Sequence, residues 1–387
     1  MYRDLASYYL RWYHEKPMVI CSSRRDELRT LHTILMKCIS HFISHWRDYL
    51  QLGEKETAIL EEQSLFPFRA GTFRPDYLVE QDNSLRLCEI TSRFFAHGIF
   101  MSQFSHLFAE RFMSRFPNEI WEDSFDRMMD KMLAITEGRK RIFVFKSADK
   151  TGEIALYKKF YEGHGYTVTI LETAEIEASS DDWAQSDAFL ISALNQKDIL
   201  SLSEKTLRKM MERGMYSDFR NIFLIHDKRF LSLWFNDRFT GECLTENETL
   251  FLRQHSIPTF TCEDSPETVK KALEDKNGYI VKPAILGKSE GVYAGPLTDD
   301  ATWRKVLSEA EGYVIQPFIT QKKYPTVWEG TLYEDYICGM MLCVDDLYYD
   351  SGFFRASSLP VTNIGDDRKI AVIHSDSSAI LPYCDTL

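Results

Sequence analysis

The segment from residue 74 to residue 91 constrains the fold of this chain more than any other feature. Residues 74–80 and 85–91 alternate apolar and polar side chains with the period of two that is typical of a β-strand. The four residues between these runs are polar and turn-forming. The pattern therefore predicts a β-hairpin, with a turn that we expect to be symmetric about Asp82 and Asn83.

The predicted hairpin brings two acidic side chains together. In the symmetric register, Asp76 lies directly opposite Glu89 and Arg74 lies opposite Thr91. The four side chains then share one face, because residues two apart on a strand point the same way. Like charges that face each other across a hairpin repel, so this arrangement needs a cause. A hard divalent cation held between Asp76 and Glu89 provides one.

Length and composition indicate an ordinary globular protein of more than one domain. The chain has 387 residues, 44% of them hydrophobic and 27% charged, which suggests two or three domains. The net charge of -12 and the absence of a basic run argue against a nucleic-acid-binding surface. An acidic protein can still contain a local basic pocket for phosphates.

Targeting features and cysteine spacing point to a cytoplasmic protein. The sequence begins without an apolar signal core, and no stretch approaches the length of a membrane span. The eight cysteines are scattered without a CxxC pair. We therefore expect reduced, mostly structural thiols and no membrane association.

The order of apolar runs predicts the main elements. Residues 24–50 and 100–116 have helical spacing. Short apolar runs at 141–145, 166–171, 188–191 and 221–225, with a helical pattern at 154–161, predict a parallel α/β sheet of Rossmann-like character. Farther on, the pattern predicts helices around 267–276 and 302–310 and strands at 278–283, 313–318, 335–344 and 347–354.

A glycine-bounded loop between two predicted strands is a candidate phosphate lid. Lys282 ends the first strand, and the loop that follows reads Gly287-Lys288-Ser289-Glu290-Gly291. Glycine lets backbone N–H groups approach phosphate oxygens, and lysine supplies a compact positive charge. The loop is not a Walker motif, because no GxxxxGK[ST] precedes a helix. Taken alone, it fits a plain hairpin equally well.

Three further features are compatible with a nucleotide site. Lys228 stands where a predicted strand gives way to a helix, and Arg355 ends an apolar strand. The strand around Gln316 and Phe318 is interrupted by a proline, a shape that can leave backbone groups free to contact an adenine edge. Each has a simpler interpretation, as a helix-surface lysine, a surface arginine or an edge strand.

The order of these segments resembles the ATP-grasp superfamily, in particular its circularly permuted branch typified by glutathionylspermidine synthetase. In that branch the metal-binding carboxylates precede the lysines and the glycine-rich lid, as Asp76 and Glu89 do here. The similarity covers residues 74–93 and 222–374. It includes Arg-x-Asp at 74, Glu-Ile-Thr at 89, Asp-Lys-x-x-Leu-x-x-Trp at 227, Lys-Pro with its lid at 282, the Gln316 strand, Cys-Gly-Met-Met at 338, and Arg355 with Thr362-Asn363. The family's amidase domain has no counterpart.

Two positions depart from the family pattern. Thr91 stands where the family's Glu-x-Asn pair has asparagine, and a hydroxyl binds magnesium less strongly than an amide carbonyl does. The lid reads Gly-Lys-Ser-Glu-Gly where the family tends to have Gly-Arg-Glu-Gly.

The resemblance implies an ATP-dependent carboxylate–amine ligase that forms an amide through an acylphosphate and releases ADP and phosphate. Its fold would be α/β, with N-terminal helices and the metal hairpin over 1–138, a Rossmann-like domain over 139–230 and the ATP-grasp domain over 231–387. Its partners would be ATP, Mg²⁺, a small carboxylate and an amine, with a homodimer expected by analogy. A phosphotransferase and a nucleotide-binding scaffold that has lost activity are the alternatives.

The resemblance also implies roles for individual residues. The metal ligands would be Asp76, Glu89 and Thr91, and the acyl group and the tetrahedral intermediate would be held by Arg74 and Arg355. The ATP contacts would be Lys228, Lys282, Gly287, Lys288, Ser289, Gly291, Gln316 and Phe318.

Overall fold

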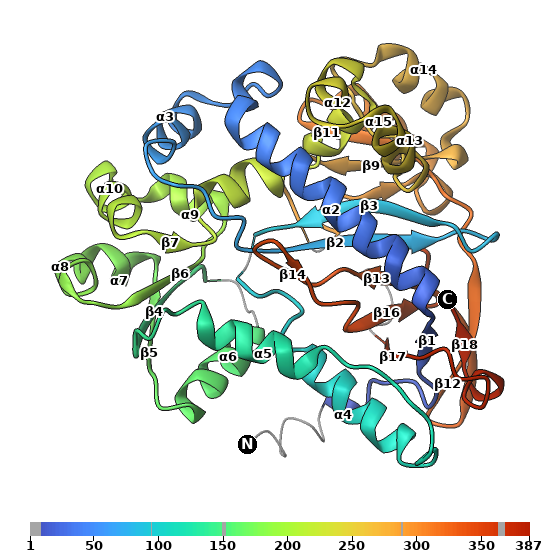
Figure 1. The fold of residues 1–387 in the computed structure, drawn as a ribbon. Coiled ribbons are helices and arrows are strands. Elements are labelled where there is room, and N and C mark those ends of the chain that lie inside the picture. The colour runs from blue at the N-terminus through green and yellow to red at the C-terminus, as the bar shows by residue number, and fades with distance from the viewer. Residues whose placement is uncertain (1–8, 94, 149–151, 288, 363–367) are drawn as a thin grey trace.

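The computed structural model describes residues 9–93, 95–148, 152–287, 289–362 and 368–387. Within this part of the chain, helices surround three β-sheets (Figure 1). One sheet has ten strands and the other two have four each. The protein is therefore a mixed α/β protein, as the sequence predicts.

The ten-stranded sheet joins the two ends of the chain. The N-terminal part supplies β1 (Met18–Ile20), β2 (Thr72–Val79) and β3 (Leu85–Thr91). The C-terminal part supplies β12 (Lys323–Trp328), β13 (Thr331–Met340), β14 (Cys343–Val344), β15 (Leu347–Tyr348), β16 (Phe353–Ser357), β17 (Arg368–His374) and β18 (Asp385–Thr386). Because β2 pairs with both β3 and β13, the predicted hairpin is built into this sheet.

The predicted register of β2 and β3 is confirmed for the four candidate site residues. Asp76 pairs with Glu89, and Arg74 pairs with Thr91. Both strands are largely buried. The alternation of apolar and polar residues specifies their pairing because a slip of one residue would exchange the two faces of a strand.

The predicted symmetric turn is wrong. Beside the loop, Val79 pairs with Leu85, which offsets the register by one residue and centres the turn differently. Asn83 has a φ of 68°, the left-handed conformation that often ends a three-residue hairpin loop. A register shift then leaves Cys88 as an extra residue of β3, a β-bulge. The bulge compensates for the offset and restores the predicted pairing farther from the turn.

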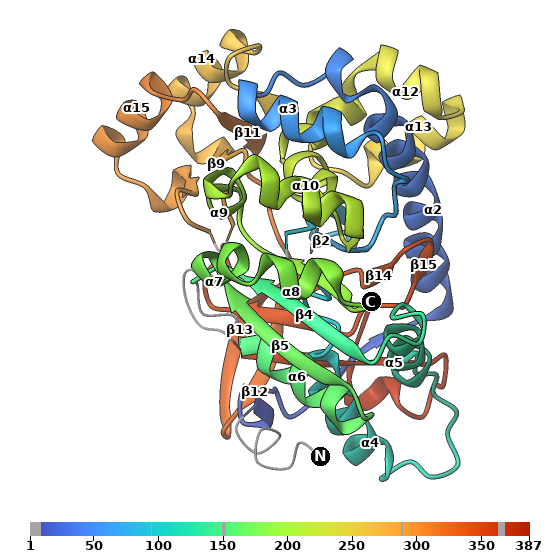
Figure 2. The same ribbon diagram turned by 90° about the vertical axis from the view of Figure 1, so that its left-hand side faces the viewer.

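A four-stranded parallel sheet occupies the middle of the chain. Its strand order is β5-β4-β6-β7, from β4 (Arg141–Lys146), β5 (Thr167–Glu172), β6 (Phe189–Ala193) and β7 (Met215–Tyr216). Figure 2 shows β4 and β5 side by side. Its connecting helices are α6 (Gly152–Gly163), α7 (Thr173–Ala178), α8 (Ser180–Gln185), α9 (Gln196–Ser201) and α10 (Glu204–Arg213). Val144 packs with Tyr157 of α6, whereas Phe143 and Phe145 pack with Trp183 of α8. Both faces are thus covered, as parallel sheets require.

One predicted strand of this region is a helix. Residues Asn221–Ile225 form a short π-helix, η2, and all five are buried. A short, continuously apolar run does not distinguish a buried strand from a buried helical turn, because neither shows a polar face. The fourth strand of the parallel sheet is instead β7.

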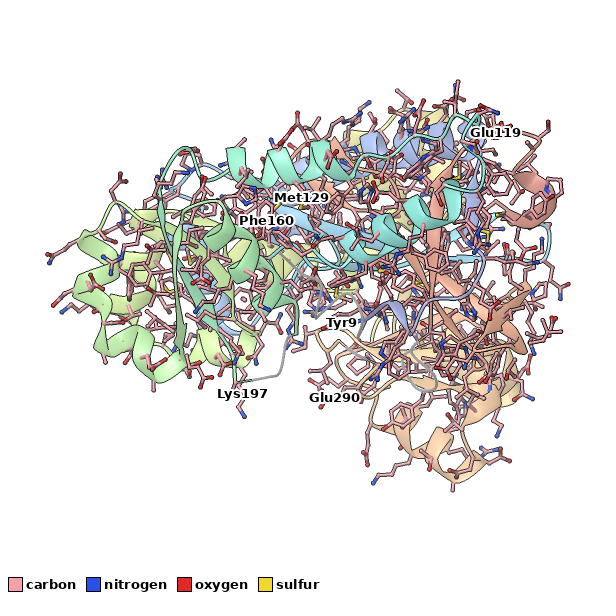
Figure 3. The ribbon with its side chains drawn as sticks, turned by 90° about the horizontal axis from the view of Figure 1, so that it is seen from below. Tyr9, Glu119, Met129, Phe160, Lys197 and Glu290 are labelled. Atoms are coloured by element: carbon pink, nitrogen blue, oxygen red, sulfur yellow. The ribbon has the colours of Figure 1, made fainter. Side chains whose placement is uncertain are left out.

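A second four-stranded sheet is antiparallel and carries the candidate lid. Its order is β10-β9-β11-β8, from β8 (Phe260–Thr261), β9 (Tyr279–Pro283), β10 (Tyr293–Ala294) and β11 (Tyr313–Pro317), covered by α14 (Pro266–Glu274) and α15 (Asp300–Ser308). Val281 and Ile315 pack against Trp303 of α15. Lys282 and Gln316, on alternate positions, therefore point to the opposite face. In the view of Figure 3, the lid residue Glu290 lies on the same side of the molecule as Lys197.

Helix α2 (Ser22–His45) crosses the large sheet beside β2 and β3 (Figure 1). Leu31 and Leu35 of α2 share a core with Phe73 and Tyr77 of β2. The other α-helices of the described ranges are α3 (Glu54–Gln63), α4 (Ser102–Met113), α5 (Phe125–Ala134), α11 (Arg229–Ser232), α12 (Asp237–Cys243) and α13 (Glu246–Gln254). None of the helices in the described ranges has both the length and the apolar character needed to cross a membrane.

Candidate functional site

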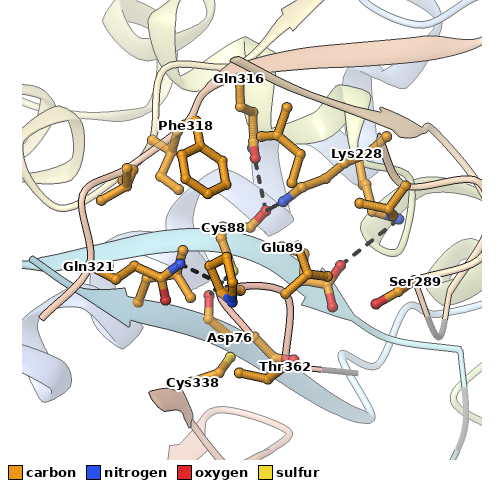
Figure 4. Close-up of a pocket in the computed structure, with 18 of the residues that line it drawn as sticks. Asp76, Cys88, Glu89, Lys228, Ser289, Gln316, Phe318, Gln321, Cys338 and Thr362 are labelled. Carbon is orange, nitrogen blue, oxygen red and sulfur yellow. Dashed lines mark hydrogen bonds and ion pairs between the residues drawn. The ribbon is translucent and has the colours of Figure 1, made fainter. Parts of the chain in front are cut away.

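A cavity lies between the β2–β3 hairpin and the small antiparallel sheet (Figure 4). Its empty volume is about 780 Å³ including the part open to solvent, which is within the range of small-molecule sites. Nine of the residues predicted from the sequence line it: Asp76, Glu89, Lys228, Lys282, Gly287, Ser289, Gln316, Phe318 and Arg355. Residues from the two ends of the chain and from its middle thus meet at one place.

Three predicted site residues are placed differently, and a fourth lies outside the described residues. Arg74 and Thr91 are buried in the sheet behind the cavity wall, with 3% and 8% of their surfaces exposed. Gly291 is at the far end of the lid loop and is not among the lining residues. Lys288 lies outside the described residues.

Arg74 forms a two-pronged ion pair with Asp76. Its Nε and Nη2 atoms donate to the two carboxylate oxygens over 2.7 and 2.8 Å. Nη2 also donates to the hydroxyl of Thr91 over 3.5 Å. Burial alone would lower the pKa of Arg74, but attraction to Asp76 raises it above its ordinary value. Two of the three predicted metal ligands are therefore bonded to one guanidinium group, which offsets the repulsion that the facing carboxylates would otherwise feel.

Glu89 is the cavity-lining carboxylate that lies beside a lysine. Its side chain is 29% exposed, and its Oε2 lies 4.0 Å from Nζ of Lys228. Burial tends to raise the pKa of Glu89, but attraction to Lys228 and Lys282 outweighs it and lowers that pKa below its ordinary value. Glu89 is consequently ionised at neutral pH and surrounded by positive charge.

The two lysines tie the lid and the hairpin together. The backbone N–H of Lys228 donates to Ala284 over 2.9 Å, and its Nζ donates to the carbonyl of Leu286 over 2.6 Å. Nζ of Lys282 lies 3.5 Å from the carbonyl oxygen of Cys88. Burial lowers the pKa of Lys228, and the nearby charge of Lys282 lowers it further. Two like charges are thus held close together, an arrangement that an anion would stabilise.

The β-bulge has a function that the sequence pattern did not indicate. The amide Nε2 of Gln316 donates to Thr259 Oγ1 over 2.8 Å and lies 3.4 Å from the carbonyl oxygen of Cys88. The bulge frees this carbonyl from the strand ladder, so that Lys282 and Gln316 both contact it. A three-residue loop, in place of the expected even-numbered one, shifts the register by one residue. Considering such a loop for the β2–β3 hairpin would have predicted a bulge.

Glycine is required at one end of the lid loop. Gly291 has a φ of 67°, and a Cβ atom there would lie 2.8 Å from Cγ of Pro283. The loop can therefore fold back onto the end of β9 only with glycine at this position. β10 pairs with β9 in the antiparallel manner predicted for a lid hairpin.

Sequence reasoning missed most of the apolar wall of the cavity. Ile257, Ile280, Val292 and Ile319 line it together with Phe318. Ile280 could have been predicted to line the cavity, because it lies two residues before Lys282 on β9 and so shares its face. Ile257 lies in a loop, where no periodicity indicates which way a side chain points. The cavity thus has an apolar part and a charged part.

The carboxylates offer an incomplete metal site on their own. No group of three or more His, Cys, Asp or Glu side chains that could hold a metal ion occurs within the described ranges. Magnesium in nucleotide sites is commonly bound by one or two carboxylates, with phosphate oxygens and water completing the shell. Glu89 with Asp76 fits that pattern provided that a nucleotide supplies the remaining oxygens.

Comparisons with known proteins give a family for this chain and two similarities at low identity. The chain is 20% identical over 348 residues to the ATP-grasp enzyme ankG of Aspergillus thermomutatus, covering 76% of this chain and 72% of that protein. A putative gamma-glutamylcysteine synthetase from Methylobacillus flagellatus KT aligns with 84% of this chain and 82% of its own, with 8% identity and a TM-score of 0.38. The profile of the AnkG N-terminal domain matches residues 31–224, half of the chain. This chain therefore belongs to the AnkG N-terminal domain family.

Proposed function

We propose that this protein is an ATP-dependent carboxylate–amine ligase of the circularly permuted ATP-grasp type, with a Rossmann-like domain around the parallel sheet. One observation carries the proposal. The cavity brings the N-terminal carboxylate Glu89 together with Lys228, Lys282 and the glycine-bounded lid, which come much later in the chain. This is the order that distinguishes the permuted branch from other ATP-grasp enzymes.

The two parts of the cavity suit the two parts of ATP. The purine would occupy the apolar part beside Ile280 and Phe318, where Gln316 is held by Thr259. The phosphates would lie between Lys228 and Lys282, under the lid. The described lining contains three basic residues against two carboxylates, one of which is already paired with Arg74. The site therefore attracts anions although the whole chain carries a net charge of -12.

The proposed reaction needs positioning and charge neutralisation more than covalent help from the protein. A substrate carboxylate attacks the γ-phosphorus of ATP, the bond to ADP breaks, and an acylphosphate forms. An amine then attacks the acyl carbon and phosphate leaves. Mg²⁺, held by Glu89 with Asp76, would neutralise phosphate charge. Arg355 lines the cavity on β16 and would hold the acyl oxygens, while Arg74 would fix the position of Asp76.

A screen for joined products tests the proposal. The full chain would be incubated with Mg²⁺, ATP and panels of carboxylic acids and amines, and phosphate release would be compared with the masses of new products. We expect an acid and an amine joined with loss of water, together with ADP and phosphate. A stable phosphorylated acceptor formed without an amine would instead indicate a phosphotransferase.

One observation favours a second candidate, a nucleotide-binding protein without ligase activity. Both oxygens of Asp76 are engaged by Arg74, and the third predicted ligand is a threonine. Such a protein would bind ATP without producing ADP under any substrate pair in the screen.

Replacing Lys282 with methionine is expected to weaken binding of the non-hydrolysable ATP analogue AMP-PNP by ~10- to 100-fold, the value of one hydrogen bond to a charged group. Methionine keeps the apolar stem of the buried side chain but removes its charge. Isothermal titration calorimetry measures the change. The control is Lys158→Met on the exposed surface of α6, for which we expect unchanged affinity. Equal affinities of the wild type and Lys282→Met for AMP-PNP would show that Lys282 does not contact the phosphates.

Replacing Thr91 with asparagine restores the amide that the resemblance places here. We expect the affinity for Mn²⁺ in the presence of AMP-PNP to stay level or to rise by no more than ~10-fold, because an amide oxygen is the better ligand. Electron paramagnetic resonance of free Mn²⁺ measures it. A large fall would show that the contact between Thr91 and Arg74 has a different and more important purpose.

A further inference from the structure

Gln321 lies where two hollows of the protein meet. It lines the candidate nucleotide cavity and also a second hollow, with an empty volume of about 1030 Å³ including the part open to solvent. Only 7% of the surface of Gln321 is exposed. The second hollow is lined in addition by the exposed residues Gln81, Thr320 and Lys323. Gln321 therefore stands at the boundary between the enclosed part of the site and solvent.

The side-chain amide of Gln321 has an orientation that one contact fixes. Nε2 donates to the carbonyl oxygen of Pro360 over 3.0 Å. A carbonyl oxygen only accepts, so the NH₂ group is the part of the amide that faces Pro360. Within the described ranges, Oε1 is buried without a hydrogen-bond donor. Because an unpaired buried acceptor costs free energy, this oxygen marks a place where a ligand would supply the donor.

The backbone holds this amide at the end of the cavity that is remote from the carboxylates. Gln321 pairs with Glu80 in an antiparallel bridge directly after β2. Glu80 is four residues beyond Asp76, about 13 Å along an extended strand. In the close-up of Figure 4, Gln321 and Glu89 lie on opposite sides of Cys88. Gln321 is thus away from the proposed phosphate position and near the nucleoside end of the site.

A second glutamine occupies the apolar part of the cavity, where the purine is proposed to lie. Gln316 pairs with Ile280 across β11 and β9, and its Nε2 is held by Thr259. Its Oε1 is likewise buried and has no donor among the residues that the structure describes. The acceptor beside the purine is therefore Gln316, whereas Gln321 borders the open hollow. The part of a nucleotide that suits this border is the sugar, whose hydroxyl groups are hydrogen-bond donors.

We propose that Oε1 of Gln321 accepts a hydrogen bond from a ribose hydroxyl of the bound nucleotide, so that Gln321 selects ribonucleotides over deoxyribonucleotides. This inference rests on the proposed function, since it assumes a nucleotide in the cavity. A nucleotide without that hydroxyl leaves the buried oxygen unpaired, and a site built to hydrogen-bond a hydroxyl rejects the analogue that lacks it.

A comparison of ADP with 2′-deoxy-ADP and 3′-deoxy-ADP tests each hydroxyl separately. Calorimetry on the full chain with Mg²⁺ would measure the three affinities. For the wild type we expect at least one deoxynucleotide to bind ~3- to 10-fold more weakly than ADP, the value of one neutral hydrogen bond. Gln321→Met keeps the length of the side chain but removes the acceptor, so this ratio should fall to about 1. Gln81→Met is the matched control and should keep the wild-type ratio, because Gln81 lines the open hollow but not the cavity.

Inosine diphosphate tests the competing assignment, a contact between Gln321 and the purine. Its base has an oxygen in place of the 6-amino group of adenine, whereas both ribose hydroxyls are kept. We expect Gln321→Met to leave the ratio of the affinities for ADP and inosine diphosphate unchanged. A fall in that ratio would place Gln321 against the purine and overturn the inference.

The outcomes separate the inference from the proposed function. A wild-type protein that binds ADP and both deoxynucleotides equally would overturn the role of Gln321 while leaving the nucleotide site intact, and this result needs no variant. A wild-type protein that binds none of these nucleotides would overturn the proposed function itself. If Gln321→Met does not fold, as judged by its thermal unfolding, Gln321→Asn decides, because it keeps the amide but withdraws it by one carbon atom. A lower preference for ADP over the deoxynucleotides then supports the proposal, and an unchanged preference contradicts it.

Discussion

Replacing Glu89 with glutamine is expected to reduce ATP turnover by at least ~100-fold, because the site loses the carboxylate that would neutralise charge during phosphoryl transfer. Glu89 is the predicted metal ligand that lines the cavity with a lysine beside its carboxylate. Glutamine has nearly the same shape, so the fold should be retained. ADP formation is measured with the acid and amine that the product screen identifies.

A second measurement on the Glu89→Gln protein does not depend on the substrates. Binding of Mn²⁺ in the presence of AMP-PNP should fall by ~10-fold or more when one anionic ligand is removed. Glu162→Gln is the control, since Glu162 is a half-exposed residue of α6 whose pair with Lys158 has little energetic value. Full turnover and unchanged Mn²⁺ affinity in Glu89→Gln would show that the metal site lies elsewhere.

The sequence predicted the hairpin well, because the physics behind it is local. Alternating apolar residues fixed both strands, and a slip of one residue would turn every side chain of a strand to the other face of the sheet. Local periodicity also predicts the face on which Lys282 and Gln316 lie, because each alternates with apolar residues along its strand, β9 or β11. Their meeting in one cavity came from the family resemblance, which supplied long-range information that periodicity lacks.

Features that depend on contacts between distant segments could not be predicted from the sequence. The π-helix at Asn221–Ile225 has no polar face that would have revealed its period. The bulge at Cys88 followed from the turn geometry, which the assumption of symmetry concealed. Arg74 is two residues before Asp76 in the sequence, yet a two-pronged ion pair depends on the side-chain rotamers that the packed sheet selects. In the sequence, this ion pair was indicated by a basic residue, Arg74, two positions before an acidic one, Asp76.

Replacing Asp335 with asparagine is expected to lower the free energy of unfolding by ~3–5 kcal/mol, the usual cost of removing one partner of a buried ion pair. Asp335 on β13 accepts two hydrogen bonds from Arg368 of β17, over 2.9 and 2.5 Å. The hydroxyl of Thr326 donates to it over 3.1 Å, and Nε2 of His14 lies 3.2 Å away. The carboxylate is fully buried and Arg368 is 3% exposed, so asparagine would remove a buried negative charge that two hydrogen bonds join to that guanidinium. Urea unfolding followed by circular dichroism measures the loss, with exposed Asp130→Asn as the control.

The same carboxylate makes stability depend on acid in a defined range. Burial alone would raise the pKa of Asp335, but hydrogen bonds from His14 and Arg368 lower it from 3.8 to about 2. A carboxyl group whose pKa is lowered by folding contributes its stability above the unfolded value, and loses it as the pH falls toward the folded value. The wild type should therefore lose this contribution between about pH 4 and pH 2. Asp335→Asn has no such proton to bind, so the difference in stability between the two proteins should shrink over that interval. A difference that stays constant with pH would mean that Asp335 is held by packing and not by its charge.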